Sequence, residues 1–301
     1  MQFKHQAVSD LAFILQAPLI YQDIAIAKFW LSDWRLRLNI LDQEPKPLID
    51  KINQCKSHFL GSYFETLFSF AINNLSSFDI IFEHKQLITP DRTLGEIDAL
   101  VRTQDGKLHQ FEVAIKFYLE SNHELGHWVG PNKNDSFIKK YDRAKNHQLK
   151  VLALPEASAL INDYDLNGPI NTYLLMFGIL YNQIAKSDDL TLFQDRITRY
   201  LTEKEEIINQ DARTGFWINE DNLIWLKSGF ISAQELFKPH WISDPIEQEV
   251  STQNSLHFSA WQDDINEKFK QDNRPRHFLI KWKKSDFDSH YIRLFIVPSL
   301  W

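Results

Sequence analysis

Apolar residues in the first quarter of the chain recur at helical spacing. Residues 1–57 form a mostly helical pattern, which the proline-containing stretch 43–47 interrupts. Between residues 58 and 77, five apolar side chains recur three or four positions apart, and this predicts a helix with one buried face. They are Phe64, Leu67, Phe68, Ala71 and Leu75.

Beyond this helix the pattern changes to that of strands. Three strand-like runs are followed by a polar, basic helix and then by an apolar run that suits a buried strand. The strands span residues 78–87, 94–103 and 107–119, the helix 134–149 and the last strand 170–181. The middle of the chain is therefore predicted to hold a helix, three strands, a helix and a strand.

The last third of the chain alternates between charged and apolar stretches. A charged helix is expected near 186–209, with short strands at WIN (217–219) and LIWL (223–226). The apolar runs 277–284 and 291–298 are expected as the final strands.

These elements together predict an α/β fold with mixed α+β character around a central mixed sheet. We expect a helical N-terminal extension (1–57), a core (58–182) and a C-terminal helix and strand region (183–301).

The segment Gln104-Asp105-Gly106 joins two of the predicted strands. It suits a three-residue hairpin loop, a type I turn closed by a left-handed glycine. Thr103 then pairs with Lys107, and Asp98 falls opposite Glu112. Because side chains alternate between the faces of a strand, this register separates an apolar face from a polar one. The apolar face holds Ile97, Ala99, Val101, Phe111, Val113, Ile115 and Phe117, and the polar face holds Glu96, Asp98, Glu112 and Lys116.

Two carboxylates that face each other across a strand pair repel when both are ionised, and a divalent cation removes that penalty. Carboxylate and water oxygens suit Mg²⁺, which leaves room in its coordination sphere for a substrate phosphate. A lysine beside the cation can orient or deprotonate a water, or offset charge on the phosphorus. Asp98, Glu112 and Lys116 therefore match the needs of phosphodiester hydrolysis. The alternative is a solvated acidic strand face with an ordinary lysine.

The same hairpin resembles a known family. GEID (95–98) followed by FEVAIK (111–116) resembles the GEID…EVK hairpin of Holliday-junction resolvases in the PD-(D/E)XK nuclease superfamily. More narrowly, GEIDAL, FEVAIKFYL, WVGPN and DLAFILQAPLI resemble motifs of the bacterial domain-of-unknown-function family 1853. The nuclease resemblance covers roughly residues 58–182 and implies a restriction-endonuclease-like core, while the narrower one extends over most of the chain.

The resemblance also implies roles for individual residues. Asp98 and Glu112 would be ligands of Mg²⁺ or Mn²⁺, with Glu65 completing the metal site, and Lys116 would be the catalytic lysine. In the common pattern the lysine follows the glutamate by two positions, where this chain has Ala114. Lys116 stands one step further along the same face, about 6–7 Å away. This departure keeps open a catalytically silent module that binds nucleic acid or protein.

A basic helix after the hairpin offers contacts to a nucleic acid, DNA or RNA. Lys139, Lys140 and Arg143 lie on it, and Gln148 follows. Such a helix could track a phosphate backbone, or its charges could be an ordinary solvated face. The C-terminal region repeats the pattern around Trp282, which could stack on a base or pack in a core. Its basic residues are Lys268, Lys270, Arg274, Arg276, Lys281, Lys283 and Lys284.

Residues 123–127 spell a rival motif. His123-Glu124-Leu125-Gly126-His127 matches the HExxH pattern of zinc metallopeptidases. On a helix, His123 and His127 would share a face and bind Zn²⁺, and Glu124 would act as the general base. The motif follows directly on a predicted strand, and a loop that merely spells HExxH is the simpler interpretation.

Composition narrows these possibilities. The net charge of −7 argues against a protein whose whole surface binds nucleic acid, although it permits a local basic groove. The single cysteine excludes an internal disulfide and a multi-cysteine zinc site. No apolar run reaches the roughly 18 residues that a membrane-spanning helix needs. We therefore expect a cytoplasmic protein that does not enter a membrane.

Overall fold

The computed structural model describes residues 2–55, 57, 59–123, 126–184, 207–246, 257–283 and 289–301. The chain divides into two compact units. Unit 1 holds residues 1–115 and 139–177, and unit 2 holds residues 116–138 and 178–301. Strands β4 (Leu108–His123) and β6 (Ile170–Gln183) have residues in both units. The N-terminal helices thus belong to the same unit as most of the predicted core.

Four helices open unit 1, as the apolar pattern predicts. Helix α2 ends at Gln43 and α3 begins at Lys46, both within the predicted break, and Pro45 occupies the N-cap position of α3. Helix α4 is the one predicted between residues 58 and 77, and its Phe64 and Phe68 pack on Phe177 of β6 with ring centroids 5.2 and 6.1 Å apart. The bounds are α1 (Gln6–Gln16), α2 (Trp34–Gln43), α3 (Lys46–Asn53) and α4 (Leu60–Asn74), with a 3-10 turn η1 (Ile26–Phe29).

The strands of unit 1 follow the order β2-β3-β4-β6, with the short β1 (Tyr21–Gln22) paired to β6. Strands β2 (Asp79–Ile88) and β3 (Thr93–Arg102) are antiparallel, as are β3 and β4. Helix α5 (Phe137–Asn146) separates β4 from β6 in the chain. The mixed α/β class with a central mixed sheet is therefore confirmed. The predicted helix, three strands, helix and strand all occur, but β5 lies between β4 and α5, and η2, η3 and α6 lie between α5 and β6.

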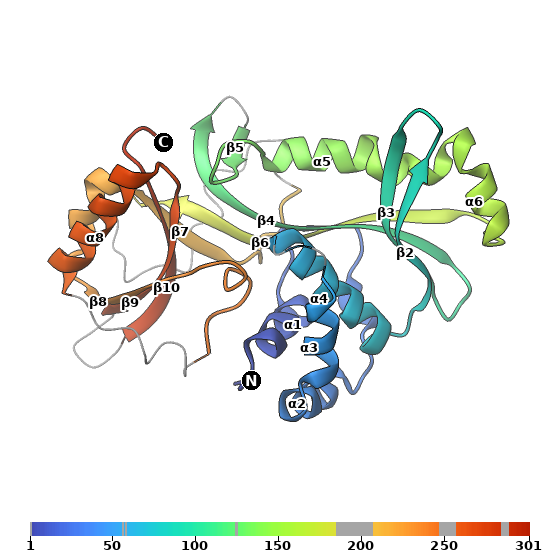
Figure 1. Cartoon of the computed structure of the whole chain (residues 1–301), viewed down its shortest axis with the longest axis horizontal. Coiled ribbons are helices and arrows are strands. Elements are labelled where there is room, and N and C mark those ends of the chain that lie inside the picture. Colours follow the sequence, from blue (N-terminus) through green and yellow to red (C-terminus); the bar gives the residue numbers. More distant parts are fainter. Residues whose placement is uncertain are drawn as a thin grey trace. The chain divides into compact units, whose positions relative to one another are not determined.

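Helices cover both faces of these strands. In Figure 1, α5 lies on one side of β4 and β6, and α1 and α4 lie on the other. The segment after α5 adds an apolar cluster in which Val151, Leu152 and Leu160 pack with Ile97 and Leu100 of β3. This segment comprises η2 (Gln148–Ala153), η3 (Pro155–Ala157) and α6 (Ser158–Asp163). Elements thus cover parts of both faces of this sheet, although the Glu96 side chain on β3 is still 40% exposed.

Unit 2 contains a mixed sheet. From β6, the order continues β7-β10-β9-β8, with parallel pairs β6–β7 and β7–β10 and antiparallel pairs β10–β9 and β9–β8. The short β5 pairs with β4. The strand bounds are β5 (Gly126–Val129), β7 (Thr214–Asn219), β8 (Phe230–Glu235), β9 (Arg276–Lys283) and β10 (Ser289–Val297).

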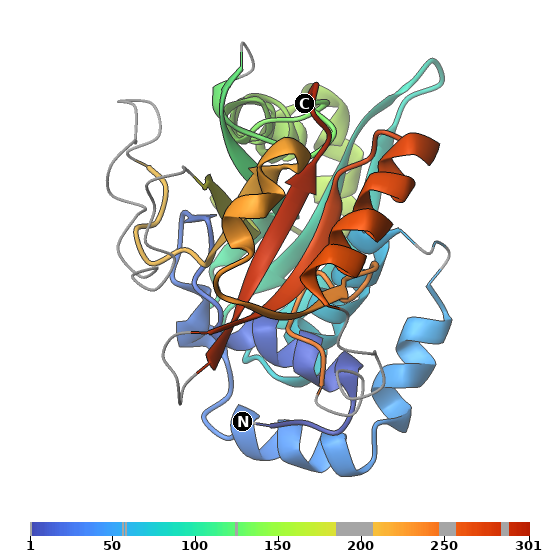
Figure 2. The ribbon, with the colours of Figure 1, turned by 90° about the vertical axis from the view of Figure 1, so that its left-hand side faces the viewer.

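One face of this sheet carries the core of unit 2. Helix α8 (Phe258–Gln271) and the 3-10 helix η5 (Glu220–Leu226) lie over it (Figure 2), and Trp261, Ile265 and Leu223 pack with Phe278 and Leu294. None of the helices in the described part of the chain has both the length and the apolar character needed to cross a bilayer.

The predictions for the last third of the chain have mixed outcomes. The final two strands and the strand at WIN are confirmed as β9, β10 and β7. The strand predicted at LIWL is wrong, because these residues lie in η5. The Asn219 side chain accepts a hydrogen bond from the Asp221 backbone N–H and so begins a helical turn there. The helix predicted near 186–209 lies largely outside the described residues.

Candidate functional site

The hairpin between β3 and β4 has the predicted register. Ala99 pairs with Phe111 and Arg102 with Leu108. The Thr103 backbone N–H donates to the Lys107 carbonyl oxygen at 3.0 Å, and Gly106 has the left-handed φ of 81° that closes the loop. Asp98 and Glu112 therefore project from the same face of the hairpin, as predicted.

Asp98 is held in place by the neighbouring strand. Its Oδ2 accepts a hydrogen bond from the Val113 backbone N–H at 2.7 Å. Burial raises the pKa of Asp98 well above its usual value, and the negative charge of Glu112 raises it further. A side-chain hydrogen bond joins Glu112 to Asp98. The charge of Glu112 thus disfavours ionisation of Asp98, whereas the hydrogen bond with Asp98 lowers the pKa of Glu112.

Glu112 is almost completely buried, and a lysine from α5 reaches it. The Lys140 Nζ lies 2.6 Å from Glu112 Oε1 and 3.1 Å from Gln148 Oε1. Burial raises the pKa of Glu112, although Lys140 and Arg143 oppose this shift with their positive charges. The site therefore contains a buried ion pair next to a second carboxyl group.

Glu65 brings a third carboxylate from α4. Burial raises the pKa of Glu65, and the charges of Glu96 and Glu112 add to the shift, whereas His84 and Lys140 oppose it. His84 Nδ1 lies 3.5 Å from Glu96 Oε1. The predicted Glu65, Asp98 and Glu112 are thus close enough to affect one another's ionisation.

An open groove of about 510 Å³ lies beside Glu65 in unit 1. Polar side chains of α4 line it, including Ser62 and Thr66, and Cys55 and His84 border it. The carboxylate cluster is therefore next to a surface depression.

Lys116, the lysine singled out in the sequence, has a different partner. Its Nζ donates to Asp135 Oδ2 at 2.6 Å, and both residues belong to unit 2. The ammonium group that bonds Glu112 is that of Lys140, which the sequence placed among the contacts to nucleic acid. Lys140 follows the buried Phe137 by three positions and precedes the buried Ala144 by four. This spacing places Lys140 on the apolar face of a basic helix, and it was the sequence signal that the Lys140 side chain points into the protein.

Gln148 and Gln110 complete the surroundings of Lys140. The Gln148 backbone carbonyl accepts a hydrogen bond from Gln110 Nε2 at 3.1 Å. Gln110 stands two positions before Glu112 on β4, on the same face of the strand, and is 1% exposed. Sequence reasoning did not select Gln110, although its place on the polar face of the hairpin was a usable signal.

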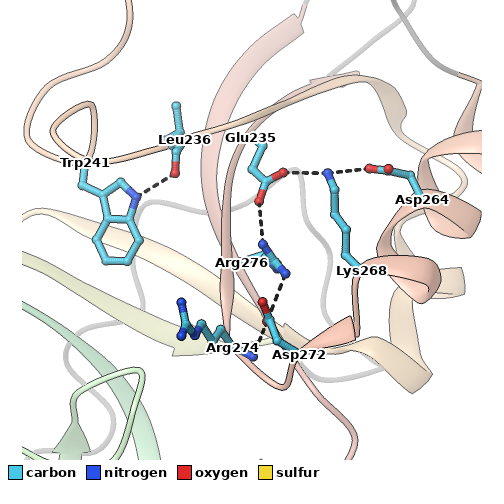
Figure 3. Close-up of polar contacts among 8 residues, drawn as sticks. All are labelled: Glu235, Leu236, Trp241, Asp264, Lys268, Asp272, Arg274 and Arg276. Carbon is cyan, nitrogen blue, oxygen red and sulfur yellow. Dashed lines mark hydrogen bonds and ion pairs between the residues drawn. The ribbon is translucent and has the colours of Figure 1, made fainter. Parts of the chain in front are cut away.

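The other predicted contacts to nucleic acid lie in two places. Lys139 and Arg143 are exposed on α5. In the C-terminal region, Lys268 lies 2.7 Å from both Glu235 and Asp264, and Arg276 lies 3.0 Å from Asp272 (Figure 3). These two cations are therefore paired with carboxylates inside unit 2. Trp282 is 3% exposed and packs in the core of that unit.

The two histidines of the HExxH motif lie on strands. His123 ends β4 and pairs with Gly126, and His127 lies in β5. His127 Nε2 is 3.6 Å from Glu120 Oε1. Glu124 and Leu125 lie outside the described residues. The zinc peptidase alternative requires both histidines on one helix, and His123 and His127 do not have that arrangement.

The carboxylate pair suits Mg²⁺ or Mn²⁺ in its chemistry. Asp98 and Glu112 offer hard oxygen donors whose mutual repulsion a divalent cation would relieve. In the part of the chain that the structure describes, no three His, Cys, Asp or Glu side chains are grouped so that they could hold a metal ion. The fit is thus to a cation that takes one or two carboxylates and completes its shell with water or phosphate oxygens.

A family model matches nearly the whole chain. A family described as Domain of unknown function (DUF1853) matches residues 9–297. No curated protein and no solved structure matches the chain.

Proposed function

We propose that this chain, which belongs to the DUF1853 family, is a metal-dependent nuclease that hydrolyses phosphodiester bonds in DNA or RNA. The fold we infer for unit 1 is a restriction-endonuclease-like core of the PD-(D/E)XK type. Its support is that α4, β2, β3, β4, α5 and β6 follow one another in this order, with β5 inserted before α5 and α6 before β6, and that neighbouring strands have the order β2-β3-β4-β6.

One observation carries the proposal: Asp98, Glu112 and Lys140 meet on one face of the hairpin. Glu112 bonds Lys140 at 2.6 Å and also interacts with Asp98. Two carboxylates and an ammonium group suit phosphodiester hydrolysis. The two carboxylates can hold a divalent cation, and the ammonium group can balance negative charge on the phosphate.

Each side chain has a role in this proposal. Asp98 and Glu112 would hold Mg²⁺ or Mn²⁺, with Glu65 beside them. The cation, when bound, would polarise the phosphate and lower the pKa of a water molecule. The Val113 N–H fixes the orientation of the Asp98 carboxylate by its 2.7 Å hydrogen bond. Lys140 would place its positive charge against the phosphate oxygens, and exposed Lys139 and Arg143 on the same helix would contact the backbone of the nucleic acid.

The lysine role passes from Lys116 to Lys140 in this assignment. Lys116 pairs with Asp135, whereas Lys140 pairs with the proposed metal ligand Glu112. A lysine supplied by the helix after the hairpin also accounts for Ala114 at the position where the common pattern has the lysine.

Cleavage assays with matched variants test the proposal. The full chain is incubated with Mg²⁺ or Mn²⁺ and labelled single-stranded, duplex and branched DNA and RNA. We expect Asp98→Asn and Glu112→Gln to abolish cleavage, and Lys140→Met to lower the rate by about 10²-fold or more. Lys116→Met and the exposed turn variant Asp91→Asn should cleave at the rate of the wild type. Undiminished cleavage by Asp98→Asn or Glu112→Gln would overturn the assignment.

A second candidate function rests on the ion pair itself. Lys140 neutralises Glu112 without a metal ion, so the same fold could serve as a silent module that only binds nucleic acid or protein. Binding of an oligonucleotide that is unaffected by Asp98→Asn, together with no turnover in any divalent metal, would favour this candidate over the nuclease.

A further inference from the structure

We propose that Lys140 is a built-in counter-ion that a divalent cation displaces from Glu112, and that Gln148 is a positioning residue that retains the displaced ammonium group. The inference rests on the proposed metal site and assigns to Gln148 a role that the carboxylate pair alone does not define.

Lys140 bridges two acceptors of different character. Its Nζ donates to the charged Glu112 Oε1 at 2.6 Å and to the neutral Gln148 Oε1 at 3.1 Å. The Lys140 side chain is 12% exposed and that of Glu112 is 4% exposed. Water therefore offers little compensation if either partner is lost, and the ammonium group depends on these two oxygens.

A hydrogen bond from β4 holds the backbone of Gln148 in place. Its backbone carbonyl accepts a hydrogen bond at 3.1 Å from Gln110 Nε2, whose residue is buried in β4. The same strand carries Glu112 two positions further on. The distance between the two acceptors of Lys140 is thus set by one strand and one helical turn rather than by flexible chain.

A divalent metal ion and the Lys140 ammonium group compete for the Glu112 carboxylate. A divalent ion that binds Glu112 repels the ammonium group and competes for the carboxylate oxygen to which that group donates. The Gln148 amide oxygen remains available to Lys140, which keeps the positive charge beside the site. The free energy of metal binding must consequently include the cost of moving Lys140, and Gln148 reduces that cost.

This arrangement predicts opposite effects for the two residues. Removing the ammonium group in Lys140→Met leaves Glu112 without its internal cation, so Mn²⁺ should bind about 10-fold more tightly. Removing the amide in Gln148→Ala takes away the neutral acceptor that displaced Lys140 would keep, so Mn²⁺ should bind about 10-fold more weakly. In the double variant, the Gln148 substitution should have no further effect, because there is no ammonium group to retain.

The experiment is isothermal titration of the metal-stripped full chain with Mn²⁺, with circular dichroism as a check on folding. Lys150→Met is the matched control, since Lys150 is an exposed lysine in the same segment as Gln148. It removes one positive charge from that region without touching Glu112, and its affinity should stay within about twofold of the wild type.

Comparison of the two single variants with the double variant distinguishes a positioning role of Gln148 from a general distortion of the site. A Gln148 substitution that merely distorts the site would weaken Mn²⁺ binding in the Lys140→Met background as well, and this result would overturn the inference. Equal or weaker binding by Lys140→Met, or absence of Mn²⁺ binding in all variants, would also overturn it. Failure of the proposed nuclease looks different: Mn²⁺ binds with the predicted pattern, but no nucleic acid is cleaved.

Discussion

At the scale of single residues, Asp98 and Glu112 show how strongly surroundings change a carboxyl group. Both have raised pKa values, and burial is the largest cause for each. Their types and their shared face were predictable from the sequence, because a three-residue loop fixes the register. The choice between Lys116 and Lys140 was not, because it depends on how far α5 is rotated about its axis, and that rotation is set by packing of Phe137 and Ala144.

The raised pKa of Asp98 predicts a pH-dependent stability in the absence of metal. The folded chain retains a proton on Asp98 at pH values where the unfolded chain has lost it. The associated stability is complete below the ordinary carboxyl pKa near 4 and is lost as pH rises through the raised value. In the presence of a metal chelator, the free energy of unfolding of the wild type should therefore fall as pH rises, relative to that of the Asp98→Asn variant. The fall should be at most about 1.4 kcal/mol per pH unit.

Urea unfolding of both proteins between pH 4 and pH 8 measures this difference. Parallel curves for the two proteins would contradict the shift. Saturating Mn²⁺ should reverse the trend for the wild type only, because the cation favours the ionised carboxylate.

At the scale of elements, periodic patterns were sufficient where one side of an element is buried. They located α4, the three strands that follow it and α5. They were insufficient where a side chain bonds the backbone. The Asn219 side chain accepts a hydrogen bond from the Asp221 N–H, so a 3-10 helix begins there and includes LIWL. Strand β8 was not predicted, since none of its six residues is fully buried and its apolar signal is weak.

Two glycines on regular elements should respond in opposite ways to alanine. Gly61 is the second residue of α4, and an added Cβ there would meet no atom within 4 Å. Gly61→Ala should raise the free energy of unfolding by about 0.5–1 kcal/mol, because alanine restricts the unfolded chain and favours the helix. Thermal or urea unfolding measures this effect, and a loss of stability would show that α4 begins differently.

Gly178 in β6 should not tolerate the same change. Its φ is 135°, and an added Cβ would lie 1.6 Å from the Lys116 carbonyl oxygen. Gly178→Ala should destabilise the protein by about 3 kcal/mol or more, since the backbone of β4 or β6 must move. An unfolding midpoint equal to that of the wild type would contradict this close approach.

At the scale of the whole molecule, each compact unit is built from two separate stretches of chain. The mixed α/β class could be predicted from the succession of patterns. The grouping of residues 116–138 with residues 178–301 could not, because it depends on contacts between positions far apart in sequence. Three hydrogen bonds join the two stretches of unit 2. Trp217 Nε1 donates to the Glu120 carbonyl oxygen, the Gln183 N–H donates to Glu120 Oε2, and Trp301 Nε1 donates to the Pro131 carbonyl oxygen.

A fragment of residues 178–301 should therefore fail to fold as unit 2 does in the full chain. It lacks Glu120 on β4 and Pro131 just after β5, which are the acceptors of those three hydrogen bonds. We expect a broad, weakly cooperative thermal transition by circular dichroism, with the full chain as the reference. A sharp transition at the temperature of the full chain would show that residues 116–138 are dispensable for unit 2.

Cys55 is the single cysteine of the chain, and it borders the groove that also contains Glu65. Its Sγ donates to the Ser57 carbonyl oxygen at 3.1 Å, and the residue is half-buried. A thiol-reactive nitroxide or fluorophore would consequently attach at one position, next to the carboxylates, without any engineered cysteine. Mn²⁺ is paramagnetic, so Mn²⁺ bound at the proposed site of Asp98 and Glu112 would broaden the resonance of a Cys55 spin label. The native chain thus offers a single attachment point for a probe that reports the occupancy of the proposed metal site.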